Sequence, residues 1–245
     1  MGIYVGTSGY DYPHWIGVFY PQDLPKGKRF HFYVRHFRTV EVNYTFYHFP
    51  SERTAERWAE LAPEGFVFSV KAHRTFTHRK KLGSSEESLR EFLGRLAPLC
   101  GKLGPILFQL PPNLRPDLDR LKAFLDRLPE GFGYAMEFRD DRWLEEETLS
   151  LLREFGVAYC IVSAPGLRRL LEVTAPFAYV RLHGTEAWYA YRYTDEELRW
   201  WAEVINELGD RAEDVFVYFN NDYRGYAVEN ALTLMAFLKE LGCRC

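Results

Sequence analysis

Residues 106–138 read ILFQLPPNLRPDLDRLKAFLDRLPEGFGYAMEF, and this stretch decides the fold class. Short apolar runs at Ile106–Leu110 and Tyr134–Phe138 predict two strands. The amphipathic segment Pro116–Leu128 between them predicts a helix. A strand, a helix and a second strand in this order are typical of a crossover unit in a parallel sheet.

The same alternation continues in both directions along the chain. Further strands are expected at Ile3–Gly6, Thr39–Val42, Phe66–Lys71, Val157–Val162, Phe177–Leu182 and Val215–Phe219. Further helices are expected at Glu52–Leu61, Glu86–Leu99, Glu145–Phe155, Asp195–Leu208 and Val228–Leu241. Two connections are weaker, because Lys26–Phe37 is aromatic-rich and Pro165–Val173 leaves room for only a short helix. Eight such units in 245 residues predict one α/β domain over residues 1–245, a TIM (β/α)8 barrel with one short or irregular unit.

A doubly wound open sheet is the alternative fold. That fold would favour a Gly-x-Gly-x-x-Gly loop between a strand and a helix, and no strand here is followed by one. The early loop Gly6-Thr7-Ser8-Gly9 leads into Tyr-Asp-Tyr-Pro instead. The barrel is therefore preferred.

The composition is that of an ordinary globular domain, with 47% apolar and 27% charged residues. A net charge of −3 gives no overall positive field for nucleic acid. Since there is no membrane-length apolar run, no signal peptide and no Cys-x-x-Cys pair, we expect a cytoplasmic protein without a membrane partner. The end of the chain, Cys243-Arg244-Cys245, is expected to be a loose tail.

Polar side chains occupy alternate positions toward the carboxyl ends of the predicted strands. Alternate side chains of a strand share a face, and in a barrel the apolar partners face the helices. The polar set is therefore expected to point inward, at the rim where barrel active sites lie. It comprises Glu41, Asn43, Thr45, Ser69, Lys71, His73, Gln109, Glu137, Arg139, Arg181, His183, Tyr218, Asn220 and Asp222.

The charges within this set argue for a role beyond stability, because each ion taken out of water costs several kcal/mol. The alternative is a self-satisfied ion-pair network, for example Glu41 with Lys71 and Glu137 with Arg181. Lys71, Arg139 and Arg181 outnumber the two glutamates, and such a mouth suits a carboxylate or phosphate ligand. His78 with Lys80 and Lys81 forms either an anion-attracting lip or a solvated loop.

A metal or a glycosidase site is less favoured, and no cofactor is expected. A divalent metal would draw on Glu41, His73, Glu137, His183 and Asp222, but cations are interleaved among them and no metal-binding spacing is present. A glycosidase would use two carboxylates flanking the scissile bond. Strands two and five, which carry Glu41 and Glu137, are expected to lie far apart around the ring.

Several stretches resemble one known family. They are Gly6–Trp15 with Phe19–Pro21, Val40–Tyr47, Val70–Ala72 with His78, Phe108–Asn113, Glu137–Arg139 with Trp143, Tyr179–Gly184 and Tyr218–Asp222. In this order they resemble the YecE-like family, domain of unknown function 72, although Tyr10 stands where tryptophan is expected and Tyr44 where a small polar residue is usual. The resemblance implies a TIM barrel but no particular reaction. Related metal-dependent barrels carry a dense His/Asp/Glu set that this sequence lacks.

We therefore expect an enzyme that acts by acid–base chemistry on a small phosphate- or carboxylate-bearing, or nucleotide-like, substrate. Phosphoester hydrolysis and an isomerase or lyase reaction both fit. The expected catalytic residues are Glu41, Lys71, Glu137 and His183, with either glutamate as general base and His183 as acid or base. The expected substrate-binding residues are Trp15, Asn43, Tyr47, His73, His78, Gln109, Arg139, Trp143, Arg181, Asn220, Asn221 and Asp222.

The alternative function is a non-catalytic protein that binds single-stranded nucleic acid or nucleotides. The rim aromatics would stack the bases, unless they serve to pack the loops onto the barrel, and the basic residues would bind phosphate. The sequence favours no oligomeric state.

Overall fold

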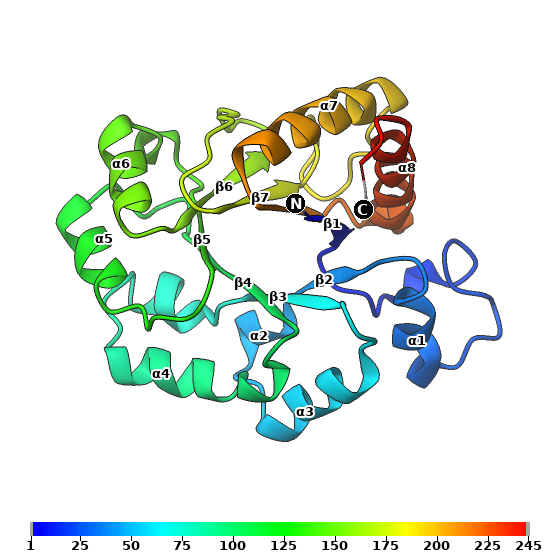
Figure 1. Ribbon diagram of the computed structural model, residues 1–245, viewed down its shortest axis with the longest axis horizontal. Helices are drawn as coiled ribbons and strands as arrows, with labels where there is room; N and C mark the ends of the chain where they lie inside the picture. The colour runs from blue at the N-terminus through cyan, green and yellow to red at the C-terminus, as the bar shows by residue number, and fades with distance from the viewer. Residues whose placement is uncertain (1, 244–245) are drawn as a thin grey trace.

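Eight parallel strands form a nearly closed barrel with helices outside it, as Figure 1 shows for the computed structural model, which describes residues 2–243. The strands are β1 (Gly2–Thr7), β2 (Thr39–Val42), β3 (Val67–Lys71), β4 (Leu103–Gln109), β5 (Tyr134–Glu137), β6 (Ala158–Ser163), β7 (Phe177–Leu182) and β8 (Asp214–Phe219). Their order in the sheet is β1-β8-β7-β6-β5-β4-β3-β2. The predicted TIM-like barrel is confirmed.

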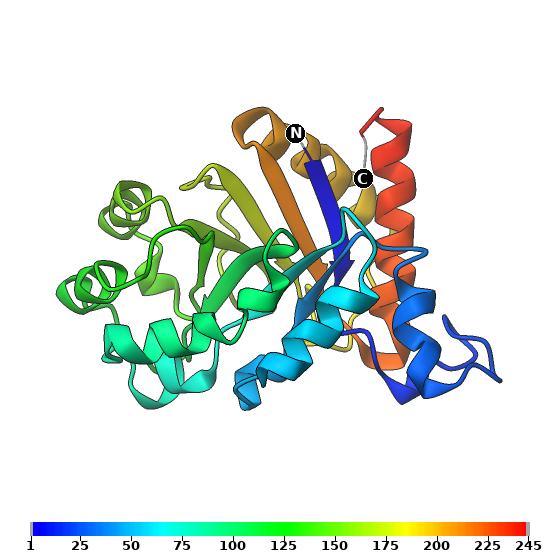
Figure 2. The ribbon, with the colours of Figure 1, turned by 60° about the horizontal axis from the view of Figure 1, so that its bottom comes forward.

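Within residues 2–243, a helix follows every strand except β6. The helices are α1 (Arg29–Tyr33), α2 (Tyr44–Tyr47), α3 (Glu52–Leu61), α4 (Glu86–Gly94), α5 (Leu118–Leu125), α6 (Glu146–Glu154), α7 (Asp195–Arg211) and α8 (Tyr226–Glu240). Side-chain caps fix several starts; Thr194, for example, forms a capping box with Glu197 at the start of α7. Figure 2 shows α8 beside β1, so the last helix of the described residues packs next to the first strand.

Residues 164–176, between β6 and β7, contain no helix, so this connection is the irregular unit that the sequence predicts. Two local expectations are wrong. Asn43 and Thr45 do not continue the alternation of the second strand beyond Val42, because the backbone turns into α2 at Asn43. The Thr45 hydroxyl lies within hydrogen-bond distance of the Val42 and Lys71 carbonyl oxygens. Cys243 is not part of a loose tail but is buried, with Sγ 3.1 Å from Asn206 Oδ1. Arg244 and Cys245 lie outside the described residues.

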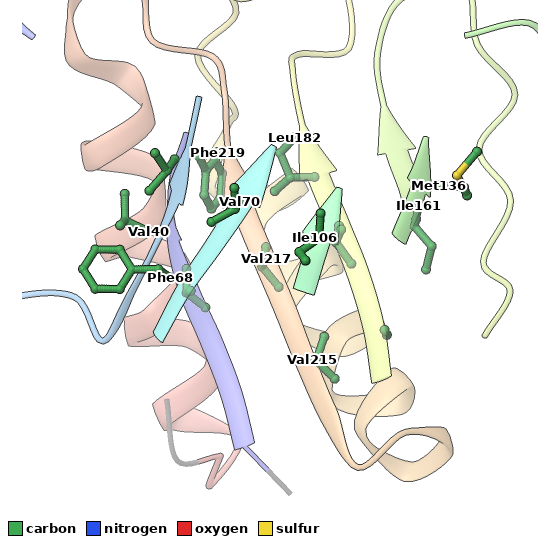
Figure 3. Packing of buried hydrophobic residues seen from close by; sticks show 14 of the residues in the cluster. Val40, Phe68, Val70, Ile106, Met136, Ile161, Leu182, Val215, Val217 and Phe219 are labelled. Carbon is green, nitrogen blue, oxygen red and sulfur yellow. The ribbon is translucent and has the colours of Figure 1, made fainter. Parts of the chain in front are cut away.

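Two apolar clusters follow the alternation of side chains along the strands. The larger cluster includes Val40, Phe68 and Met136, and Figure 3 shows these side chains among others from neighbouring strands. The smaller cluster includes Cys160, Tyr179 and Phe216, which alternate along their strands with members of the larger cluster. The charged positions 41, 137 and 181 alternate with members of the larger cluster on their own strands. Within residues 2–243, no helix has the length and apolar character needed to cross a bilayer.

The barrel closes between β1 and β2 by very few contacts. An isolated bridge joins Ser8 to Glu41, and the Gly9 amide donates to the Glu41 carbonyl at 2.8 Å. The backbones of β1 and β2 approach so closely that a Cβ atom at Gly6 would lie 2.4 Å from the Thr39 carbonyl oxygen. Gly6 is therefore required by the closure itself.

Gly6→Ala is expected to lower the free energy of unfolding by about 1–3 kcal/mol, because the added methyl group must displace backbone. Gly27→Ala is the matched control, since a Cβ atom there meets nothing within 4 Å. Urea denaturation of both variants measures the effect. Equal midpoints for Gly6→Ala and the wild type would contradict this account of the closure.

Candidate functional site

A single guanidinium group spans the barrel interior. Arg181 on β7 is fully buried, and its Nη2 donates to Glu41 Oε1 at 2.7 Å while its Nη1 donates to Glu137 Oε2 at 2.5 Å. Glu41 lies on β2 and Glu137 on β5. The two carboxylates are thus bridged by Arg181, although their strands are not neighbours in the sheet.

Both carboxylates also accept hydrogen bonds from further donors. Glu41 also accepts hydrogen bonds from Ser8 Oγ at 2.6 Å and from the Tyr179 hydroxyl at 2.8 Å. The second oxygen of Glu137 accepts from Nε of Arg139. Burial alone would raise the pKa of Glu137, but Arg139 and Arg181 hold it well below its usual range. Glu137 is therefore a fixed negative charge.

His183 completes the network in its neutral form. Its Nε2 lies 3.1 Å from Arg139 Nη2 and 3.5 Å from Arg181 Nη1, and the side-chain amide of Asn220 lies 3.2 Å from its Nδ1. Burial, and then the charge of Arg181, lowers the pKa of His183 to about 3. Because guanidinium groups only donate hydrogen bonds, they keep Nε2 as an acceptor.

Lys71 is the exception in this network. Its Nζ lies 4.3 Å from the centre of the Phe46 ring and, within residues 2–243, forms no hydrogen bond or ion pair. Burial and the neighbouring Arg181 lower the pKa of Lys71 to about 8, although Glu137 and Glu41 act in the opposite direction. The interior cations Lys71, Arg139 and Arg181 thus face two carboxylates, which leaves one positive charge unmatched near neutral pH.

Of the two ion pairs that the sequence suggests as examples of a self-satisfied network, only one is present. Glu137 pairs with Arg181, but Glu41 does not pair with Lys71. The register of the sheet explains the difference, because Glu41 lies beside Ser69 and Lys71 is two residues nearer the rim. The unmatched lysine is a consequence of this offset.

A family model described as "Protein of unknown function DUF72" matches residues 4–243. The chain belongs to the DUF72 family. It is 30% identical to the UPF0759 protein YunF of Bacillus subtilis, over 96% of this chain and 94% of that protein. It is 32% identical to the UPF0759 protein YecE of Escherichia coli O157:H7, over 66% of this chain and 59% of that protein.

Solved structures agree with the sequence comparison. The crystal structure of a DUF72 family protein from Thermotoga maritima matches with a TM-score of 0.89 at 32% identity, covering 98% of this chain and all of that one. A DUF72 family protein from Enterococcus faecalis matches with a TM-score of 0.84 at 22% identity, covering 97% and 95%. The resemblance found in the sequence motifs is confirmed.

Several other expected site residues of this DUF72 protein contact backbone carbonyls or an aromatic ring. Gln109 is buried, and its Nε2 donates to the Leu110 carbonyl at 2.6 Å. His73 lies 3.2 Å from the Tyr47 carbonyl oxygen, and the His78 ring packs edge-on against Phe46. Tyr47 itself is largely exposed. The basic stretch that includes Lys80 and Lys81 follows His78 at the surface.

Other expected binding residues are committed to holding loops. Trp143 is buried and donates from Nε1 to the Leu114 carbonyl, so its ring is not available at the rim. Trp15 is buried as well and donates to Asp222 Oδ1 at 2.5 Å. Asn221 donates to the Tyr191 carbonyl and to Asn230 Oδ1. A large indole with one N–H is most stable when its body is buried and that N–H is paired, which accounts for both tryptophans.

Three residues that contact the charged side chains are missing from the site residues predicted from the sequence. Ser8 and Tyr179 bind Glu41, and the Trp188 ring lies 4.5 Å from the Arg139 guanidinium carbon. Tyr179 shares the two-residue spacing of Arg181 and His183, so the strand pattern could have identified it. Among residues 2–243, no three His, Cys, Asp or Glu side chains gather in a way that would hold a metal ion.

Arg181→Met is expected to lower the free energy of unfolding by about 3–5 kcal/mol, because it leaves two buried carboxylates without their shared cation. Arg142→Met removes an exposed arginine that pairs with Asp140, and it is expected to change stability little. Chemical denaturation at pH 7 compares the two variants. Similar losses in both would contradict the central place given to Arg181.

The pKa of His183 gives stability a defined pH dependence. The unfolded chain takes up a proton near pH 6.5, whereas the folded protein resists protonation down to about pH 3. The free energy of unfolding should therefore fall on acidification through this window, by up to about 1.4 kcal/mol per pH unit from this group. His183→Asn should remove that component, and His31→Asn, an exposed control, should retain it.

Measuring each variant against the wild type at pH 4.5–6.5 isolates the contribution of His183. The comparison also cancels Asp222, whose pKa is raised to about 6, mainly by burial, and which acts in the opposite direction. Parallel curves for His183→Asn and the wild type would show that the imidazole is not held neutral.

Proposed function

We propose that this DUF72 protein is an enzyme that binds a small anionic substrate at the carboxyl-terminal rim of the barrel and exchanges a proton with it through Lys71. The observation that carries the proposal is the unmatched Lys71 ammonium group. Every other charge of the interior set is paired, and an anion beside Lys71 would bring the set to neutrality.

Arg139 supplies the second contact to the anion. Its Nε and Nη2 are used by Glu137 and His183, and within the described residues Nη1 forms no hydrogen bond. The side chain retains 9% of its exposure, and the Trp188 ring lies on the guanidinium. An arginine held in this way and a nearby ammonium group suit a carboxylate or a phosphate.

Lys71 is also the group best suited to acid–base work. Each carboxylate oxygen of Glu41 and Glu137 already accepts a hydrogen bond, and the pKa of His183 lies far below neutrality. The pKa of Lys71, at about 8, is near the working pH, where a proton is given up and regained most efficiently. Fixed cations beside such an amine would stabilise an enolate, which favours an isomerase or lyase reaction over phosphoester hydrolysis.

The exposed tyrosines of the rim favour the second candidate function, single-stranded nucleic-acid binding. They are Tyr44 (51% exposed), Tyr47 (60%), Tyr189 (47%) and Tyr223 (52%). Each follows the carboxyl end of β2, β7 or β8, and such rings stack bases without sequence preference. Binding of this kind would weaken steeply with salt, because phosphate contacts release counterions.

Lys71→Met is expected to weaken binding of the anionic ligand about ten- to a hundredfold, the effect of losing one charge-assisted hydrogen bond. A thermal-shift screen of phosphorylated and carboxylated metabolites finds the ligand, and titration measures its affinity. Lys80→Met removes an exposed lysine after the same strand and should leave affinity unchanged. Wild-type affinity should fall as pH rises through about 8, where Lys71 loses its charge. A ligand bound equally well by Lys71→Met would overturn the proposal.

A further inference from the structure

A second hollow lies away from the charged interior, between the first loop and α3. Two adjoining cavities of about 570 and 440 Å³ share Tyr10, Asp11, Thr54 and Trp58 in their walls, and together we call them the α3 cleft. Both α1 and α3 lie outside the barrel strands, as Figure 1 shows. The short helix α2 separates the cleft from Lys71, since Tyr44 lines the cleft while Phe46 lies against the lysine.

One end of the α3 cleft carries unpaired positive charge. Lys26, Arg53 and Arg57 line the larger cavity. Within residues 2–243, neither the Arg53 nor the Arg57 side chain forms an ion pair or hydrogen bond. The acidic residue in the wall, Asp11, is already paired with the buried Arg29 and with Lys26. Two exposed guanidinium groups one helical turn apart, facing a hollow, suit a phosphate group.

The other end of the cleft is aromatic, with one unsatisfied acceptor. Tyr10, Tyr12, Tyr44 and Trp58 line the smaller cavity. Asn43 also lines it, and the buried Oδ1 of Asn43 has no hydrogen-bond partner among residues 2–243. Buried acceptors are almost always paired, so this oxygen is suited to a donor brought by a ligand. A flat ring with an N–H edge fits aromatic walls and this acceptor together.

We propose that the α3 cleft binds a nucleoside monophosphate. The base lies among the aromatic rings near Tyr44 and Trp58, and one of its N–H groups donates to Asn43 Oδ1. The phosphate lies against Arg53 and Arg57. The site uses none of the residues that carry the proposed reaction at Lys71, so it stands or falls separately from that function.

Calorimetric titration of the full chain with AMP, adenosine and ribose 5-phosphate tests the proposal. AMP should bind saturably, and the two partial ligands should each bind at least about tenfold more weakly, since each lacks one end of the recognition. Arg53→Ala/Arg57→Ala should weaken AMP binding at least about tenfold and leave adenosine binding unchanged. Trp58→Leu should reduce the preference for AMP over ribose 5-phosphate.

Two controls separate this site from others. Arg120→Ala removes an exposed arginine from α5 and should leave AMP affinity unchanged, as should Lys71→Met. Absence of saturable AMP binding would overturn the proposal. So would AMP binding that survives loss of both arginines, or ribose 5-phosphate binding as tightly as AMP. AMP binding lost in Lys71→Met but kept in the double arginine variant would place the nucleotide at the barrel rim instead.

Discussion

The charged interior of this barrel depends on the two ion pairs that Arg181 forms with Glu41 and Glu137. Burial of an ion lowers the stability of the fold by several kcal/mol unless the ion is paired and hydrogen-bonded. A buried guanidinium group is therefore stable inside the barrel only with matched carboxylates. Glu41 and Glu137 reach it from β2 and β5, and Tyr179 and Ser8 bind the carboxylate of Glu41. The same contacts hold together strands that are not neighbours in the sheet.

That constraint determines which groups are free for chemistry. Carboxylates and an imidazole at strand ends are ordinarily the first candidates for acid–base catalysis. Here Arg181 and Arg139 fix Glu137 as an anion and His183 as a neutral acceptor, and both become part of the scaffold. The surplus charge falls on Lys71, two residues nearer the rim. Its Nζ lies 4.3 Å from the centre of the Phe46 ring and, within residues 2–243, forms no hydrogen bond or ion pair. The α2 helix then separates this lysine from the α3 cleft.

Within the strands, the sequence was sufficient to predict much of this arrangement. Thr39–Val42 and Phe177–Leu182 were predicted with the observed bounds, and the alternation placed Glu41, Glu137 and Arg181 on one face. The alternation of side chains did not hold beyond the strand ends, because the backbone enters a helix after Asn43 and Trp143 is buried. Pairing across the ring, such as Tyr179 with Glu41, depends on register between distant segments, which no local pattern contains.

The most direct test of this account is the ionisation of Lys71 itself. NMR titration of carbon-labelled lysine side chains, with the Lys71 signal identified by its loss in a Lys71→Met sample, measures that pKa in the intact protein. The account predicts one lysine that titrates at about 8, lowered by burial and by Arg181. A Lys71 signal that titrates at the ordinary value near 10.5 would contradict it, because the ammonium group would then be solvated and not part of the charged interior.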